Sequence, residues 1–226
     1  MRLEYFTALV PISGRCARLS IVNLSRAELA LDALNDSTGT IVLVEGESDA
    51  IAVETLAARL DGSQSGGLHV LSAYGITNYR KLLTRIRTDA PQRRVVGLYD
   101  EPEEHVIQRA LASSGIGRPK CRAEIEQLGF FACVADLEDE LIRALGVDRV
   151  EQLVDDQGEL PAFRIMQRQP AQRDRSVAQQ LRRFMGTKSM RKIRYGHLLA
   201  AAVDLGNCPQ PLHRVIAAAE PDAALR

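Results

Sequence analysis

Acidic residues follow three apolar runs of the sequence at comparable places. Glu45 and Asp49 come after the first run, Asp100 after a later one, and Asp136 with Glu138 after the last. Carboxylates that converge repel one another, and a hard divalent cation with oxygen ligands relieves that repulsion. Two such ions, roughly 3.5–4 Å apart, would clamp the attacking and leaving oxygens of a phosphoryl transfer. These residues therefore indicate a metal site that acts on phosphodiesters.

The elements that must position these acids alternate between strand and helix. Four apolar runs predict strands, at Ile41–Val44, Leu68–Leu71, Arg94–Tyr99 and Gly129–Val134. Helical spacing follows each run, at Asp49–Leu60, Tyr79–Arg87, Glu103–Ser113 and Leu137–Leu145. This rhythm predicts an α/β fold with a Rossmann-like, mainly parallel sheet of about four strands flanked by helices. In such a sheet the carboxyl ends of the strands share one edge, where ligands bind.

The pattern divides the chain into three parts. Residues 1–39 form an N-terminal extension without a clear pattern, and residues 40–146 form the α/β domain. Residues 147–226 show mostly helical periodicity, and we expect them to form a helical region packed on that domain.

Charge is distributed unevenly, although Lys plus Arg equals Asp plus Glu, 29 against 29. Residues 98–160 are rich in acids, and residues 163–195 contain a single acid, Asp174. A metal site on the first segment and a phosphate-contacting face on the second would produce this asymmetry, and so would pairing within the chain. The basic residues that we expect to contact nucleic acid are Arg182, Arg183, Arg191, Lys192 and Arg194.

Each acid taken alone also has a purely structural explanation. Asp49 would favour the positive end of a helix dipole. Asp136 is well placed to cap the helix that follows it. Three acid-bearing turns on one predicted edge are harder to explain in this way.

The motifs resemble the Toprim domain, and most closely its branch in the OLD-family nucleases. Leu43-Val-Glu-Gly-Glu-Ser-Asp49 matches the first motif of that branch, and Asp136-Leu-Glu138 matches the third. The resemblance implies that Glu45, Asp49, Asp100, Asp136 and Glu138 hold two Mg²⁺ or Mn²⁺ ions. It also implies a catalytic role for Glu45, and for a lysine in the helical part, for which Lys188 in Gly186-Thr-Lys188 is the candidate.

One motif departs from the family pattern. The Asp-x-Asp motif is Asp100-Glu101-Pro102 here, so its second acid is missing, and Glu101 or Glu103 would have to replace it. We include Glu103 among the predicted metal ligands.

The resemblance also implies partners and a setting. We expect a cytoplasmic protein, with a role in phage defence, that acts on DNA rather than RNA. OLD proteins usually carry an ATPase domain, and no phosphate-binding loop motif is visible here. A separate ATPase subunit or a homodimer would supply regulation.

No apolar run approaches the roughly 20 residues of a membrane span, and the four scattered cysteines indicate reduced thiols.

Two other functions are compatible with parts of the pattern. A non-catalytic Toprim module would bind DNA or a partner ATPase, and the missing acid favours it. A receiver-like signalling domain also gathers acids at strand ends, but it begins with an acidic pair, where this chain has Glu45-Gly46. The leading hypothesis is a metal-dependent endonuclease or nickase.

Overall fold

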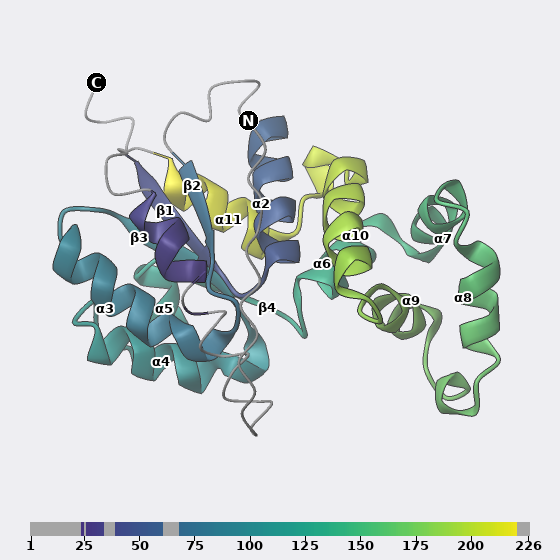
Figure 1. The fold of residues 1–226 in the computed structure, drawn as a ribbon, viewed down its shortest axis with the longest axis horizontal. Coiled ribbons are helices and arrows are strands. Elements are labelled where there is room, and N and C mark those ends of the chain that lie inside the picture. Colours follow the sequence, from purple (N-terminus) through teal and green to yellow (C-terminus); the bar gives the residue numbers. More distant parts are fainter. Residues whose placement is uncertain (1–23, 25, 34–38, 61–67, 221–226) are drawn as a thin grey trace, which may run out of the picture.

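A four-stranded parallel sheet forms the centre of the fold in the computed structural model (Figure 1). The structure describes residues 24, 26–33, 39–60 and 68–220. The strands are β1 (Thr40–Val44), β2 (Leu68–Ser72), β3 (Val95–Asp100) and β4 (Phe130–Cys133). They lie in the order β2-β1-β3-β4, with Val42 paired to Val70 on one side and to Val96 on the other.

Helices cover both faces of the sheet. Ile41 and Leu43 of β1 point into a core shared with α3 (Tyr79–Asp89), α4 (Glu104–Ser113) and α5 (Arg122–Gln127). Val42 and Val44 point into the opposite core, which contains α2 (Glu47–Leu60). Successive strand residues face opposite sides, so a strand covered on both faces is apolar throughout. All five residues of β1 are buried accordingly.

The chain after β4 is helical within the described residues. It forms α6 (Leu137–Leu145), α7 (Val147–Asp156), α8 (Leu160–Gln167), α9 (Val177–Met185), α10 (Ser189–Ala202) and α11 (Gln210–Ala219). Figure 1 shows α7, α8 and α9 to one side of the sheet, while α10 runs beside α2 and α11 returns to the sheet. The α11 helix packs on β1, β3 and β4.

A glycine lets α10 approach α2 closely. A Cβ atom on Gly196 would lie 2.6 Å from the carbonyl oxygen of Ser48, in the first turn of α2. Both residues are buried. The N-terminal turn of α2 is therefore fixed against the middle of α10.

The predicted α/β class is confirmed, and the four strands and their following helices lie within a few residues of the predicted ranges. The short helix α5 was missed, because its six residues are too few for a clear helical period. The division at residues 39 and 146 stays a prediction. Most of the predicted N-terminal extension lies outside the described residues. Within the part that the structure describes, residues 24 and 26–32 are helical. No helix in the described part of the chain is long and apolar enough to cross a membrane.

Candidate metal centre at the switch point of the sheet

Glu45 and Asp100 lie at the carboxyl ends of neighbouring strands. Glu45 follows β1 and Asp100 is the last residue of β3. The chain leaves β1 into α2 on one face of the sheet and leaves β3 into α4 on the other. Connections that diverge in this way open a crevice between the two strand ends, the usual ligand site of an open parallel sheet. Both side chains are partly buried.

Asp49 reaches the same place from the first turn of α2. Its Oδ2 accepts a hydrogen bond from the backbone N–H of Gly46 at 2.9 Å, which closes the turn between β1 and α2. Burial and the neighbouring Glu45 raise the pKa of Asp49, while Lys192 and the Gly46 N–H act in the opposite direction. The carboxylate is thus held toward the strand ends by its own turn.

Asp136 and Glu138 approach from the end of β4. Asp136 caps α6, and its Oδ1 accepts from the Asp139 N–H at 2.8 Å, as the sequence predicts. Its other oxygen, Oδ2, accepts from Arg182 Nε at 2.5 Å. The Glu138 side chain is only 2% exposed, and neither of its oxygens has a hydrogen-bond partner among the described residues.

The acids influence one another's protonation. Burial, reinforced by the charges of Glu45, Asp49, Asp136 and Glu138, raises the pKa of Asp100 to about 8. Burial and Asp49 raise the pKa of Glu138 to about 7, against the effect of Lys192. Interactions between charges weaken with distance. Glu45, Asp49, Asp100, Asp136 and Glu138 therefore share one electrostatic neighbourhood.

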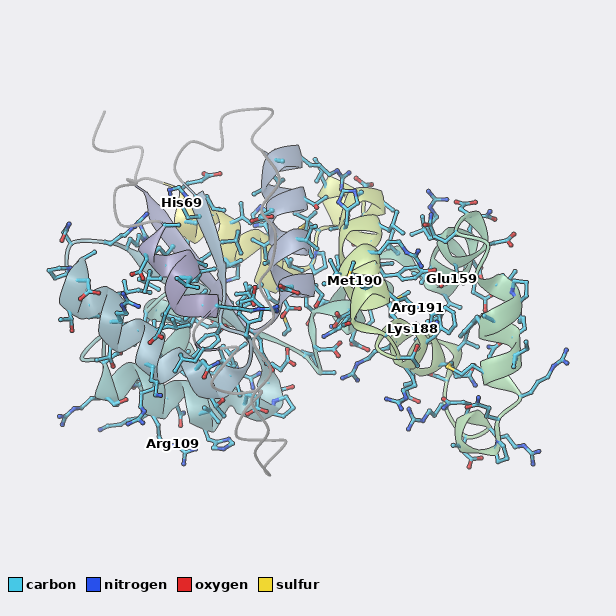
Figure 2. All side chains as sticks on the ribbon, viewed as in Figure 1. His69, Arg109, Glu159, Lys188, Met190 and Arg191 are labelled. Atoms are coloured by element: carbon cyan, nitrogen blue, oxygen red, sulfur yellow. The ribbon has the colours of Figure 1, made fainter. Side chains whose placement is uncertain are left out.

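A lysine one turn into α10 faces this cluster. Lys192 Nζ lies 3.2 Å from Oε1 of Glu138, in an ion pair. Burial opposes its charge, but Glu138 and Asp49 hold the pKa of Lys192 above its ordinary value. Lys188 instead lies at the start of α10 with an exposed side chain (Figure 2). Sequence reasoning assigned the family lysine to Lys188 and placed Lys192 only in the nucleic-acid face.

The packing of α10 distinguishes the two lysines. Residues four apart lie on one face of a helix. Lys192 is four residues before Gly196, whose missing side chain marks the face of α10 that contacts α2. That face leads directly to the strand ends, whereas Lys188 precedes the helix.

The two candidates for the missing second acid differ in their contacts. Glu101 is paired with Arg122, with 2.6 Å between Oε1 and Nη2. After burial, Glu103 makes the largest contribution to the raised pKa of Glu45. Glu103 therefore interacts electrostatically with Glu45 of the cluster, whereas Glu101 is held in an ion pair with Arg122.

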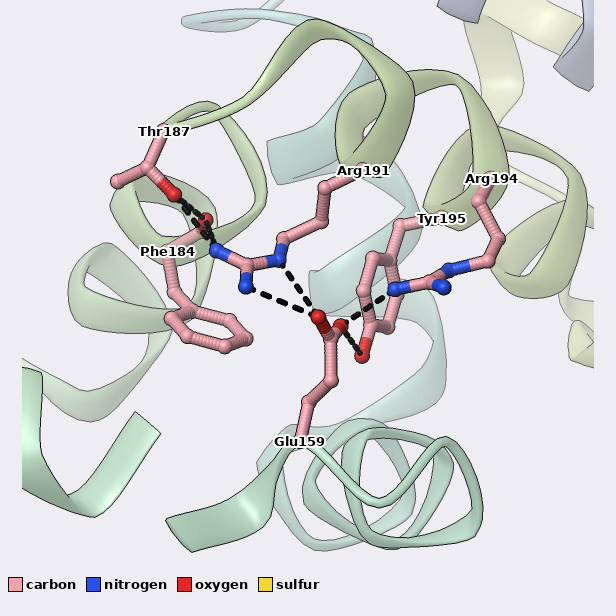
Figure 3. Close-up of polar contacts among 6 residues, drawn as sticks. All are labelled: Glu159, Phe184, Thr187, Arg191, Arg194 and Tyr195. Carbon is pink, nitrogen blue, oxygen red and sulfur yellow. Dashed lines mark hydrogen bonds and ion pairs between the residues drawn. The ribbon is translucent and has the colours of Figure 1, made fainter. Parts of the chain in front are cut away.

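Two of the five predicted nucleic-acid contacts are engaged in a network around Glu159, at the start of α8 (Figure 3). Glu159 Oε1 accepts from Arg191 Nε at 3.0 Å, and Oε2 accepts from Arg194 Nη2 at 2.6 Å and from the Tyr195 hydroxyl at 3.0 Å. The Arg191 guanidinium also lies 4.0 Å from the centre of the Phe184 ring. The charge asymmetry thus reflects, in part, pairing within the chain. Arg182 and Lys192 pair with the acid cluster, and Arg183 is exposed.

The donor set fits a hard divalent cation in its chemistry. Glu45 Oε2 and both Glu138 oxygens are buried without a hydrogen-bond partner among the described residues. Such atoms are costly unless a cation or water satisfies them. Within the same residues, no three Asp, Glu, His or Cys side chains are already arranged around one point that a metal could occupy. The acids would have to turn toward a common ion.

A cavity of about 600 Å³ opens beside the cluster. Asp136, Glu138 and Lys192 line it on the side of the acids, and residues of α9 line it on the other. Its volume is that of an ordinary ligand site.

Solved structures of two OLD proteins share this architecture. The C-terminal region of the Xanthomonas campestris pv. campestris OLD protein, in two of its structures, aligns with TM-scores of 0.59 and 0.60 and 21% identity. Each alignment covers 80% of this chain, and 93% and 92% of the Xanthomonas chain. The C-terminal region of the Burkholderia pseudomallei OLD protein aligns with a TM-score of 0.55 and 18% identity, over 80% of this chain and 96% of that one. No model of a protein family and no curated protein matches the sequence. The chain therefore has the fold of the C-terminal Toprim region of OLD proteins, as the resemblance in its motifs implies.

Proposed function

We propose that this chain is a divalent-metal-dependent nuclease that cleaves DNA phosphodiesters, as an endonuclease or nickase. The observation that carries the proposal is a set of acids at the switch point of a Toprim-like sheet, three of whose buried oxygens have no hydrogen-bond partner among the described residues. The fold it shares with the OLD proteins is consistent with it. Buried carboxylate oxygens without a hydrogen-bond partner are uncommon in native structures, and a bound ion would account for them.

The proposed ligands of Mg²⁺ or Mn²⁺ come from all three acid-bearing turns. They are Glu45, Asp49, Asp100, Glu103, Asp136 and Glu138. When bound, a pair of ions would supply a nucleophilic water at neutral pH and stabilise the leaving oxygen. The turn held by Gly46 and Asp49 keeps the first carboxylates at the strand end. Glu103 rather than Glu101 is the proposed substitute for the missing acid, because Arg122 holds Glu101.

We assign to Lys192 the charge-stabilising role that the resemblance implies for a lysine. Its ammonium group is already held beside the acids by Glu138, within reach of the cavity. A cation placed before the reaction stabilises the negative charge that develops on the transferring phosphate without having to reorganise. Lys188, by contrast, is exposed at the N-cap of α10.

A second function is a non-catalytic module that binds DNA or a partner ATPase. Two observations favour it: the departure at Asp100-Glu101-Pro102, and the absence of a ready-made metal-binding group among the described residues. This alternative predicts binding without cleavage.

Two measurements together decide between these functions. Binding of Mn²⁺, followed by electron paramagnetic resonance, tests the metal site, and nicking of supercoiled plasmid in Mg²⁺ or Mn²⁺ tests the activity. Metal binding together with nicking supports the nuclease. Metal binding without nicking selects the binding module, and the absence of both rules out the proposed site. Nicking that requires an added ATPase subunit, or a dimer in light scattering, would support the proposed partners.

A further inference from the structure

One face of α9 forms the wall of the cavity opposite the acids. Gln179, Arg182 and Arg183 of α9 line the cavity, and so does Arg175, which lies two residues before the helix begins. Gln179 is three residues before Arg182 and four before Arg183, a spacing that places residues on one side of a helix. The polar face of α9 is therefore presented directly across from the proposed metal ligands.

The helix holds this face rigidly. Its opposite side buries Leu181, Phe184 and Met185 in the core. Its start is fixed by a capping box, in which Gln179 Oε1 accepts from the Ser176 N–H at 3.0 Å and Ser176 Oγ accepts from the Gln179 N–H at 3.3 Å. The capping bond uses the oxygen of the Gln179 amide and leaves its NH₂ group as a donor. A donor on a rigid element binds without a large loss of entropy.

Two of the cations on this face are not neutralised. Arg182 is paired with Asp136, and Lys192, on the other wall, is paired with Glu138. Arg175 and Arg183 are exposed and form no ion pair with any residue that the structure describes. The cavity thus carries uncompensated positive charge next to a cluster of acids.

The lining is chemically suited to phosphate rather than to bases. Arginine guanidinium groups match phosphate oxygens in two-pronged geometry. Proteins that hold bases in a groove stack them on aromatic side chains, and none of the lining residues in the described chain is aromatic. A cavity of about 600 Å³ has the volume of an ordinary small-ligand site, which holds a few nucleotides at most. It admits one strand, not a duplex.

We propose that this cavity binds the sugar–phosphate backbone of one nucleic-acid strand, with Arg175 and Arg183 on a phosphate next to the one that is cleaved. The inference rests on the proposed function and adds the site at which the substrate would bind. It places the nucleic-acid contacts on α9 and on Arg175 just before it, while Arg191 and Arg194 of α10 belong to the Glu159 network. Recognition of this kind is independent of base sequence and strongly dependent on salt.

The test is the binding of fluorescent single-stranded oligo-dT, measured by anisotropy in Ca²⁺ over a series of salt concentrations. The double variant Arg175→Gln/Arg183→Gln removes two phosphate contacts, so the slope of log affinity against log salt becomes shallower by about 1.4. The control Arg168→Gln makes the same kind of change, with one charge removed instead of two, at an exposed site of the neighbouring helix end that does not line the cavity, and should leave the slope unchanged. Both variants change exposed side chains, and a thermal melt verifies that they are folded.

The outcomes separate this inference from the proposed activity. An unchanged slope in the double variant, or an equal change in Arg168→Gln, would overturn the proposal that the cavity binds phosphate. A loss of affinity that differs between oligo-dT and oligo-dA would overturn the assignment to the backbone. If the variants show the predicted slopes but the protein never cleaves, the phosphate-binding site is supported and the nuclease activity is refuted. If the protein cleaves but the slope of the double variant is unaltered, the nuclease is supported and the phosphate-binding site is refuted.

Discussion

Lys192 on α10 holds its ammonium nitrogen 3.2 Å from Oε1 of Glu138 on α6, a residue that is almost completely buried. This contact joins the helical part of the chain to the acids at the strand ends. It depends on the close approach of α10 to α2 at Gly196. Packing between helices that are distant in sequence therefore positions the ammonium group to which we assign the catalytic role.

Replacing Lys192 tests its assignment. In Lys192→Met, nicking of supercoiled plasmid should fall by on the order of 10²-fold, because a pre-placed donor to the developing charge is lost. The matched variant Lys188→Met should retain nearly the wild-type rate, since Lys188 is exposed at the start of α10. The opposite ranking of the two variants would return the role to Lys188.

Replacement of Glu101 and replacement of Glu103 should have different effects on nicking and on metal binding. Glu103→Gln is expected to lower the rate of nicking and to weaken Mn²⁺ binding, because Glu103 acts on Glu45. Glu101→Gln should affect both far less, because it breaks a pair with Arg122 at the surface. Paired titrations with Mn²⁺ measure this difference. Equal losses in both variants would count against Glu103 as the substitute ligand.

Gly196→Ala should destabilise the protein and displace Lys192. Alanine is better than glycine in a helix by about 1 kcal/mol. Here, however, its Cβ would lie 2.6 Å from the backbone oxygen of Ser48, and overpacking against backbone costs about 1–3 kcal/mol. We expect a lower free energy of unfolding in urea and slower nicking. The control Gly206→Ala has its nearest neighbour at 3.6 Å and should be close to neutral.

Glu159→Gln should lower the free energy of unfolding by about 2 kcal/mol, because Arg191, only 9% exposed, would lose a charged partner. The control Glu151→Gln breaks the pair with Arg164, whose side chain is 44% exposed, and should cost well under 1 kcal/mol. Urea unfolding at pH 7 measures both. Similar costs for the two variants would show that the Glu159 network is not structural.

The same network has a predicted pH dependence. Burial opposes the charge of Glu159, but hydrogen bonds from Arg191 and Tyr195 dominate and lower its pKa below 4.5. A depressed pKa stabilises the folded state above the ordinary value, and this contribution is lost as the pH falls through the lower one. The difference in stability between wild type and Glu159→Gln should therefore be full at pH 7 and shrink below pH 4.5. A difference that grows on acidification would contradict this.

Much of the fold could be predicted because its signals are local. A strand buried on both faces is apolar throughout, as in Ile41–Val44, and the turn at Glu45-Gly46 marks its end. Parallel strand ends share an edge by necessity, so topology alone predicts that Glu45, Asp100 and Asp136 lie along the same edge of the sheet. The capping role of Asp136 was also readable from its position.

The rest depends on contacts between distant segments. Nothing near Arg191 or Arg194 in sequence shows that both meet Glu159, so a basic segment looked like a uniform face for nucleic acid. The choice between Lys188 and Lys192 depends on how α10 packs against α2. Arg122, which engages Glu101, lies on the short helix that the periodicity missed.

The most direct test of the proposed centre is the rate of plasmid nicking by wild type, Glu45→Gln and Glu54→Gln, in Mn²⁺ and in EDTA. Glu54 lies further along α2, exposed and without a hydrogen bond or ion pair to a described residue, and its variant makes the same chemical change. We predict nicking that requires metal, is abolished in Glu45→Gln and persists in Glu54→Gln. Metal-dependent nicking that survives in Glu45→Gln would contradict the centre described above.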